Sequence, residues 1–130
     1  MVNLLIVSHS AQLAAGVQEF ASQVAGDEVK IAAAGGAVDG SLGTSVERIQ
    51  DGLKLVASPD GVLILVDLGS AVISVEAALE HFSDGPTLIS DAPLVEGAYL
   101  AALEATVEGT TLEQVAAAAL QARELIKVHK

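Results

Sequence analysis

Two apolar runs constrain the fold of this chain more than any other feature. One is Val62–Val66, with the sequence VLILV, and the other lies within the opening segment Val2–Ser8. An apolar run without alternation is typical of a parallel strand that is covered on both of its faces. The polar residues His9 and Asp67 follow the two runs directly. The chain therefore needs a sheet in which helices cover both sides of these strands.

Between the expected strands, apolar residues recur at the spacing of a helix. Turn-forming sequences such as Ser58–Gly61 separate the two kinds of pattern. This alternation predicts an α/β fold with an open, mainly parallel sheet flanked by helices on both faces, formed by a single domain over residues 1–130. The expected strands are residues 2–8, 29–34, 62–66 and 86–89, and the expected helices start at Ser10, at Thr44 or Ser45, after Ser70, at Pro93 and at Thr111.

The first and last helices carry more detailed predictions. In the first, a stripe of apolar residues is expected to face the core, and Gly26 ends the pattern. In the last, the sequence TLEQ from Thr111 matches a capping box, and apolar positions continue at helical spacing to Ile126. The helix expected after Ser70 is marked by apolar positions that end at Phe82. The stripe of the first helix comprises Leu13, Ala14, Val17, Phe20, Ala21 and Val24.

The composition excludes several classes of function. Seventeen acidic and six basic residues give a net charge of −11, which repels nucleic acid and anionic lipid alike. Aromatic residues make up only 2% of the chain, too few for the stacking platforms of single-stranded nucleic-acid or flavin sites. The chain has no cysteine, and no apolar run approaches the roughly 18 residues of a membrane span. We expect a cytoplasmic protein that binds neither nucleic acid nor membrane.

Polar segments follow the expected strands and should meet at one edge of the sheet. His9 and Asp67 each follow a buried strand, and a glycine-rich loop, residues 35–43, follows the second strand. In open α/β sheets, the crevice outside the carboxyl ends of the strands binds the ligand. Free N–H groups at helix starts favour anions, so a phosphoryl group is the expected occupant. The helices expected to start at this edge do so at Ser10, at Thr44 or Ser45, and at Ser70.

No nucleotide fingerprint accompanies these residues. The loop GGAVDGSLGTS has no P-loop lysine, and the first strand-to-helix turn, SHSAQLAAG, is not a dinucleotide-binding turn. What remains is His9 as a nucleophile or base, with Asp67 as a carboxylate that orients its ring. Two simpler interpretations stay open, in which His9 is a core or helix-capping residue and Asp67 only caps its helix. His81 and His129 are expected to be solvated and are assigned no role.

Four motifs in order resemble a known family. The segments VNLLIVSHS, GGAVDGSLGTS, GVLILVDLGSA and LISDAPLVEGA resemble the phosphotransferase subunit of bacterial PTS-dependent dihydroxyacetone kinase, which has the mannose-type enzyme IIA fold. The resemblance covers essentially the whole chain. It implies that His9 is the phosphorylated histidine and Asp67 its neighbour. The residues that it implies around the phosphate are Gly36, Thr44, Ser45, Gly69 and Ser70.

The resemblance also implies a phosphoryl relay. The phosphocarrier HPr would donate its phosphoryl group to His9, which would pass it to ADP bound on the nucleotide-binding kinase subunit. The ATP formed there would phosphorylate dihydroxyacetone on a third subunit, so this chain itself would hold no cofactor and no metal. The family further implies a homodimer. Some members carry additional phosphocarrier domains after this one, and the chain is similar to the single-domain form.

Three alternatives differ in function. The nearest is a mannose-type enzyme IIA that serves a sugar transporter, with the same fold and the same use of His9. The motifs GGAVDGSLGTS and DLGSA favour the kinase. A receiver-like regulatory domain would be phosphorylated on Asp67, yet the first strand ends in histidine where an acidic metal-binding pair is expected. A flavodoxin-like binding module is a weaker alternative.

Overall fold

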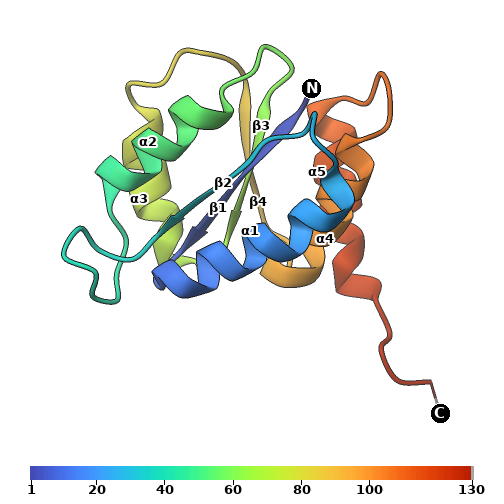
Figure 1. Cartoon of the computed structure of the whole chain (residues 1–130), viewed down its shortest axis with the longest axis horizontal. Coiled ribbons are helices and arrows are strands. Elements are labelled where there is room, and N and C mark those ends of the chain that lie inside the picture. The colour runs from blue at the N-terminus through green and yellow to red at the C-terminus, as the bar shows by residue number, and fades with distance from the viewer. Residues whose placement is uncertain (130) are drawn as a thin grey trace.

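The computed structural model describes residues 1–129, in which strands and helices alternate along the chain (Figure 1). No helix within these residues is long and apolar enough to cross a membrane. The strands are β1 (Asn3–Ser8), β2 (Ile31–Gly35), β3 (Val62–Val66) and β4 (Thr87–Ser90). The helices are α1 (Ala11–Ala25), α2 (Val46–Val56), α3 (Ser70–Leu79), α4 (Leu94–Ala105), α5 (Leu112–Leu120) and the short 3-10 helix η1 (Gln121–Glu124).

The four strands are parallel and form one sheet in the order β2-β1-β3-β4. Strand β1 lies in the middle, so that Leu4 pairs with Ile31 on one side and with Leu63 on the other. The chain leaves β1 in one direction to form β2 and then crosses back to form β3 and β4. Such a reversal opens a crevice at the carboxyl ends of the two strands concerned, here β1 and β3. The predicted open, parallel α/β sheet is confirmed.

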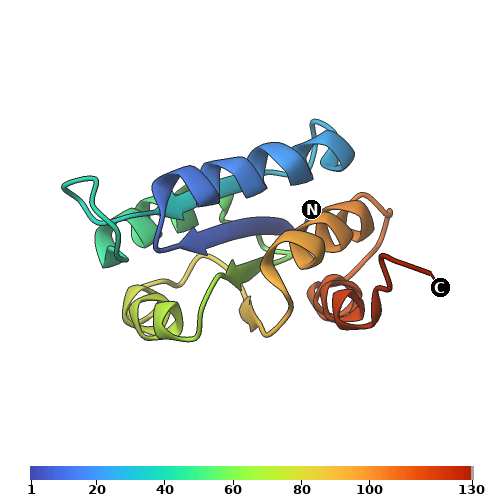
Figure 2. The same ribbon diagram turned by 90° about the horizontal axis from the view of Figure 1, so that it is seen from below.

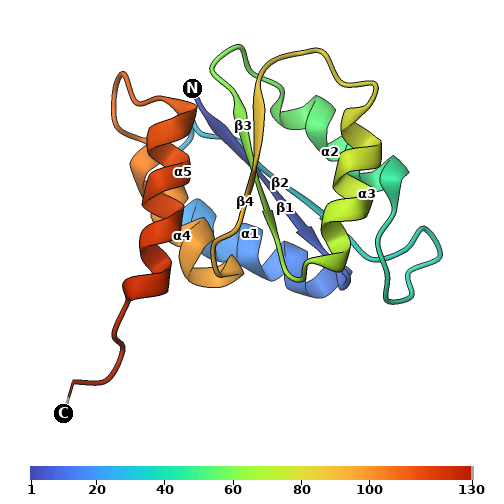
Figure 3. The same ribbon diagram turned by 180° about the vertical axis from the view of Figure 1, so that it is seen from behind.

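Helices cover both faces of the sheet, as Figures 1 and 3 show. Successive residues of a strand point to opposite faces. In β1, Leu4 and Ile6 join the core with α1, α4 and α5, whereas Leu5 and Val7 join the core with α2 and α3. All four side chains are fully buried. This burial on two faces explains why the β1 and β3 sequences are apolar without alternation.

The core face of α1 consists mainly of small residues. Ala14 and Val17 are buried, whereas Leu13 and Phe20 are 42% and 43% exposed. The prediction that Leu13 and Phe20 face the core is therefore wrong. Helix α1 contacts both the sheet and α4 (Figure 2), and close packing on two sides favours small side chains on its inner face. Phe20 instead packs against the ring of Tyr99 on α4, with 5.3 Å between the ring centroids.

The last helix is shorter than predicted. It begins with the expected capping box, in which Thr111 and Gln114 each accept a hydrogen bond from the other's backbone N–H. Helix α5 ends at Leu120, and after η1 the chain runs away from the body of the molecule (Figure 1). Ile126 is 69% exposed, so its helical spacing does not reflect packing. Phe82 likewise lies beyond the end of its helix, α3, although it packs partly against the core.

Candidate active site at the carboxyl edge of the sheet

His9 and Asp67 lie where the strand order reverses. His9 directly follows β1, and Asp67 directly follows β3. The backbone N–H of Asp67 donates to the carbonyl of Val7 at 3.2 Å, which extends the strand pairing to the start of the site. The parallel sheet therefore brings together two side chains that are 58 positions apart in the sequence.

The carboxylate of Asp67 holds the imidazole of His9 by one ring nitrogen. Nδ1 lies 3.0 Å from Oδ1 and 3.2 Å from Oδ2. A carboxylate can only accept hydrogen bonds, so Nδ1 carries the proton. The lone pair of the neutral ring is then on Nε2. The contact therefore selects the tautomer whose available lone pair is on Nε2.

Three further groups donate to the same carboxylate. Oδ2 accepts from the His9 N–H at 2.9 Å and from the Ser8 hydroxyl at 3.0 Å. Oδ1 accepts from the Leu68 N–H at 2.7 Å. Burial raises the pKa of Asp67, but the hydrogen bonds from His9, Ser8 and Leu68 lower it by more, so that the pKa lies below its ordinary value. Asp67 is therefore ionised at neutral pH and can stabilise positive charge on the ring.

The other ring nitrogen faces the start of α3. The hydroxyl of Ser70, the first residue of that helix, lies 3.0 Å from Nε2 of His9. Because Nδ1 carries the ring proton, this hydroxyl donates to Nε2. The side chain of His9 is 28% exposed and that of Asp67 is 12% exposed. The ring is thus held on its inner side and reaches solvent on its outer side.

The glycine-rich loop after β2 is attached to the same edge. The N–H of Gly43 donates to the carbonyl of His9 at 2.8 Å. Gly36 has a φ of 76°, a left-handed conformation that glycine adopts without steric cost. The guanidinium of Arg48 on α2 donates to the carbonyl of Val38 in the middle of the loop at 3.2 Å. The loop is therefore tied to β1 at its end and to α2 along its length.

The five predicted phosphate-binding residues fall into different surroundings. Ser70 contacts the ring, and Gly69 is the N-cap of α3 beside it. The amides of Gly69 and Ser70 have no hydrogen-bond partner within residues 1–129, whereas Gly36 donates to a carbonyl of β1. Thr44 bonds to a serine hydroxyl of α3 at 2.6 Å, and Ser45 caps α2. In the described part of the chain, neither Thr44 nor Ser45 is hydrogen-bonded to His9. Phosphate binding remains a prediction for all five.

Two residues of the site were not predicted from the sequence. Ser8 is fully buried and donates to Asp67; its only signal is a polar residue at the end of an apolar strand. Arg48 holds the glycine-rich loop, and its only signal is a basic residue three positions after the capping residue Ser45. Neither signal distinguishes these side chains from an ordinary strand end or helix surface.

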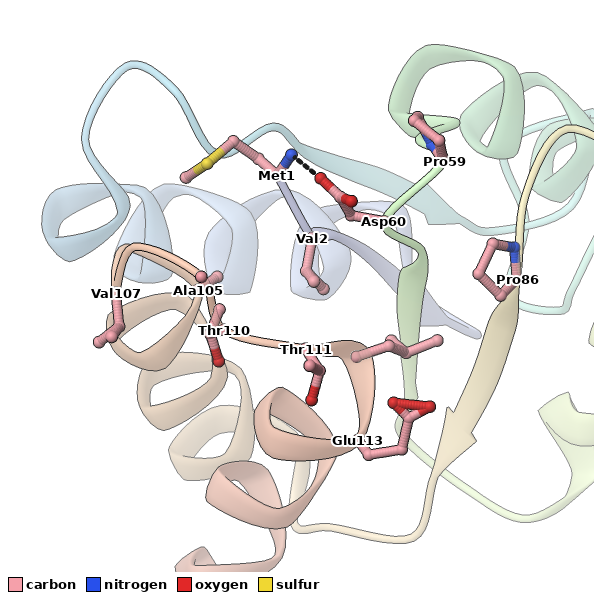
Figure 4. A pocket seen from close by; sticks show the side chains of 12 residues that line it. Met1, Val2, Pro59, Asp60, Pro86, Ala105, Val107, Thr110, Thr111 and Glu113 are labelled. Carbon is pink, nitrogen blue, oxygen red and sulfur yellow. Dashed lines mark hydrogen bonds and ion pairs between the residues drawn. The ribbon is translucent and has the colours of Figure 1, made fainter.

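Two hollows lie at opposite edges of the sheet. One of about 510 Å³ adjoins Asp67 and is bordered by the paired side chains of Asp91 and Arg123. The other, of about 430 Å³, lies at the amino edge, where the Met1 amine pairs with Asp60 at 2.5 Å (Figure 4). Residues 1–129 contain no group of three side chains that could hold a metal ion. His9 and Asp67 belong to the carboxyl edge.

Comparison with known families agrees with this arrangement. The family model EIIA-man, described as the PTS system fructose IIA component, matches residues 3–118. The chain belongs to this family. The match includes all four strands of this EIIA-man domain and both His9 and Asp67. The crystal structure of a protein of unknown function is 38% identical, with a TM-score of 0.77 over 92% of this chain and 93% of that chain.

Several relatives of this EIIA-man chain are named as subunits of dihydroxyacetone kinase. Phosphoryl donor subunit DhaM of PEP-dependent dihydroxyacetone kinase 2 from Listeria innocua is 40% identical, over 82% of this chain and 88% of that protein. The Escherichia coli DhaM subunit is also 40% identical, over 95% of this chain but only 27% of that protein. The phosphotransferase subunit DhaM of the PTS-dependent enzyme from Lactococcus lactis is 35% identical, over 86% of this chain and 88% of that protein. The resemblance indicated by the four motifs is confirmed.

Proposed function

We propose that this chain is the phosphoryl donor subunit of a dihydroxyacetone kinase and that it carries the phosphoryl group on Nε2 of His9. The observation that carries the proposal is the orientation of the ring, with Nδ1 held by Asp67 and Nε2 on the exposed side. Relatives named as donor subunits, at up to 40% identity, support the assignment to the kinase. The proposed phosphoryl source is HPr. The proposed acceptor is ADP on the nucleotide-binding subunit.

In the accepting step, the lone pair of Nε2 attacks the phosphorus of the HPr phosphohistidine. The new bond between Nε2 of His9 and phosphorus forms as the nitrogen–phosphorus bond of HPr breaks, and the HPr imidazole leaves with the bonding pair. The proton stays on Nδ1, so the ring of His9 becomes cationic and Asp67 stabilises it. In the donating step, an oxygen of the terminal phosphate of ADP attacks the phosphorus, and the lone pair returns to Nε2.

The start of α3 supplies donors for the phosphoryl oxygens. The amides of Gly69 and Ser70 are free within residues 1–129, and a helix N-terminus stabilises an adjacent anion by about 0.3–1 kcal/mol. The Ser70 hydroxyl bonds to Nε2 in the unmodified ring. When Nε2 binds phosphorus, this hydroxyl loses its acceptor and can donate to a phosphoryl oxygen instead.

The surface around the ring suits a protein partner. Leu42 and Leu68 are 81% and 61% exposed. Leu68 follows Asp67, and Leu42 precedes Gly43, whose N–H is bonded to the His9 carbonyl. Their chain neighbours Asp67 and Gly43 both bond to the backbone of His9, so two exposed apolar side chains border the ring and are available to a protein partner. We therefore propose that HPr and the kinase subunits dock here in turn, and that the homodimer implied by the family leaves this edge uncovered.

Labelling with phosphorylated HPr tests the proposed chemistry. The chain should acquire an acid-labile, base-stable phosphoryl group, His9→Ala should abolish the label, and His81→Ala should leave it unchanged. The chain lacks a nucleotide fingerprint, so ATP alone should neither label it nor bind it at micromolar concentrations. A label that survives in His9→Ala, or that maps to Asp67, contradicts the proposal. The structure argues against Asp67 as phosphoacceptor, because both of its oxygens already accept hydrogen bonds.

A second candidate is the IIA component of a sugar transporter, which the description of the matching family model favours. It would use the same donor and the same atom of His9, but the acceptor would be a transporter subunit. The labelled chain should therefore be mixed with the ADP-loaded nucleotide-binding kinase subunit and, separately, with a mannose-type transporter subunit. Formation of ATP supports the kinase. Transfer to the transporter subunit without ATP formation supports the alternative.

A further inference from the structure

We propose that Ser8 is a positioning residue, which fixes the Asp67 carboxylate and through it the tautomer and direction of the His9 ring. Ser8 is the last residue of β1, and its side chain is fully buried. Its hydroxyl lies 3.0 Å from Oδ2 of Asp67. The inference rests on the proposed function for its effect on phosphoryl transfer, whereas its effect on the ring can be measured in the unphosphorylated protein.

The direction of the hydrogen bonds at Ser8 is determined by its neighbours. The backbone N–H of Ser10 donates to the Ser8 hydroxyl oxygen at 3.0 Å. The carboxylate of Asp67 can only accept, so the single hydroxyl proton of Ser8 points to Oδ2. The buried hydroxyl thereby connects Asp67 to the residue that caps α1. With the His9 N–H on the same oxygen at 2.9 Å, two donors define the plane and rotation of the carboxylate.

The local turn at Ser8 recurs elsewhere without any reactive group. The hydroxyl of Ser58 also accepts from the N–H two positions later, that of Asp60, at 3.1 Å. Ser58 is also buried, lies at the amino edge of the sheet, and donates to the carbonyl of Met1 at 2.5 Å. The feature that distinguishes Ser8 is the target of its proton, a carboxylate that contacts the imidazole. Ser58 therefore provides a matched control for the structural part of the role.

Removal of the Ser8 hydroxyl should loosen the carboxylate and the ring together. In Ser8→Ala, Oδ2 of Asp67 loses one of its donors, so the pKa of Asp67 should rise relative to the wild type. A less firmly held carboxylate selects the Nδ1-protonated tautomer less strongly, and the Nε2-protonated form of His9 should increase. Loss of a group that orients a metal-ligating histidine typically costs 10- to 100-fold, and by analogy we expect transfer from HPr to slow about 10-fold.

The experiment compares the wild type with Ser8→Ala, Ser8→Thr and Ser58→Ala. Nitrogen-15 NMR of the imidazole gives the tautomer of His9, carbon-13 NMR of the carboxyl gives the pKa of Asp67, and quench-flow labelling gives the transfer rate. Ser8→Ala should change all three, Ser8→Thr should restore them because it keeps the hydroxyl, and Ser58→Ala should change none. If Ser8→Ala does not fold, Ser8→Cys, with a weak S–H donor of similar volume, replaces it.

The outcomes separate this inference from the proposed function. An unchanged tautomer, pKa and transfer rate in a folded Ser8→Ala or Ser8→Cys overturns the positioning role and leaves the proposed function intact. Equal changes in Ser58→Ala also overturn it, because they reduce the effect to general destabilisation. If HPr does not label the wild type, the proposed function fails, and the two NMR measurements still decide whether Ser8 positions the ring.

Discussion

Replacement of Asp67 by asparagine tests how the site sets the chemistry of its histidine. The asparagine side chain has nearly the same shape but one acceptor oxygen and one amide nitrogen in place of two oxygens. In the wild type, Oδ1 of Asp67 accepts from the Leu68 N–H and from the His9 ring, and Oδ2 accepts from the His9 N–H and from the Ser8 hydroxyl. In either orientation of the amide, its NH₂ group faces a backbone N–H. One backbone donor must lose its partner.

The size of the effect follows from these contacts. The His9 N–H is partly buried, whereas the Leu68 N–H is exposed and can bond to water when it loses its acceptor. A fully buried N–H without an acceptor costs about 1–3 kcal/mol, so this range is the upper bound for the loss in free energy of unfolding of Asp67→Asn. During acceptance of the phosphoryl group, the ring of His9 becomes cationic, and its hydrogen bond to a carboxylate contributes about 1.5–3 kcal/mol. Loss of that hydrogen bond should slow transfer by about 10- to 150-fold. If the amide NH₂ faces Nδ1, the ring proton moves to Nε2 and the loss approaches the upper value.

Three measurements check this prediction. Quench-flow labelling with phosphorylated HPr gives the transfer rate, nitrogen-15 NMR gives the tautomer of His9, and urea denaturation gives the free energy of unfolding. Asp91→Asn is the matched control, because it removes the same charge at the same edge of the sheet from a side chain that is 91% exposed. Transfer by Asp67→Asn at the rate of Asp91→Asn, with the Nδ1-protonated tautomer retained, would refute the reasoning and leave Asp67 with a structural role only, in the turn between β3 and α3.

Three further predictions concern stability. The hydrogen bonds of Asp67 lower its pKa below the ordinary value of 3.8 for an aspartate. The contribution of Asp67 to folding is therefore present above that pH and is lost as the pH falls through the folded-state pKa. In urea titrations, the difference in unfolding free energy between wild type and Asp67→Asn should shrink below pH 3.8 rather than stay constant. In Gly35→Ala, the new Cβ would lie 2.5 Å from the carbonyl oxygen of Ser10, and overpacking should cost about 1–3 kcal/mol. Gly16 lies on the exposed face of α1, and no atom lies within 4 Å of a Cβ added there. Gly16→Ala should therefore raise the free energy of unfolding by about 0.5–1 kcal/mol. Thermal and urea unfolding measure both glycine variants.

The fold could be predicted from the sequence because its signals are local and repeated. The apolar run Val62–Val66, and the alternation of strands with segments of helical apolar spacing, specify a parallel sheet covered on both faces. The capping box at Thr111 specifies where α5 begins. The sequence could not show which apolar side chains of α1 face inward. Leu13 and Phe20 are exposed while Ala14 is buried, because the inner face of α1 must fit between the sheet and α4. That constraint depends on the distance between elements.

The site was predictable to the extent that topology alone positions it. His9 and Asp67 follow the two central strands of a parallel sheet, and the carboxyl ends of such strands must meet. Ser8 was not predictable, because its importance depends on the direction in which one buried hydroxyl donates. Thr44 and Ser45 could not be placed either. A helix start was predicted near them, but whether their hydroxyls face the site or the neighbouring helices depends on side-chain rotamers.

The position of His9 suits the two successive partners of the proposed phosphoryl relay. A carrier must hold its reactive atom in a fixed direction and still expose it to protein surfaces that arrive one after the other. The contacts that fix the ring, from Asp67 to Nδ1, lie on the inner side, where the carboxylate is 12% exposed. Nε2, the proposed reactive atom, lies on the other side of the ring beside the Ser70 hydroxyl. Because orientation comes from the inner side, neither partner has to supply it, and each needs only to bring its phosphorus or its acceptor oxygen in line with Nε2.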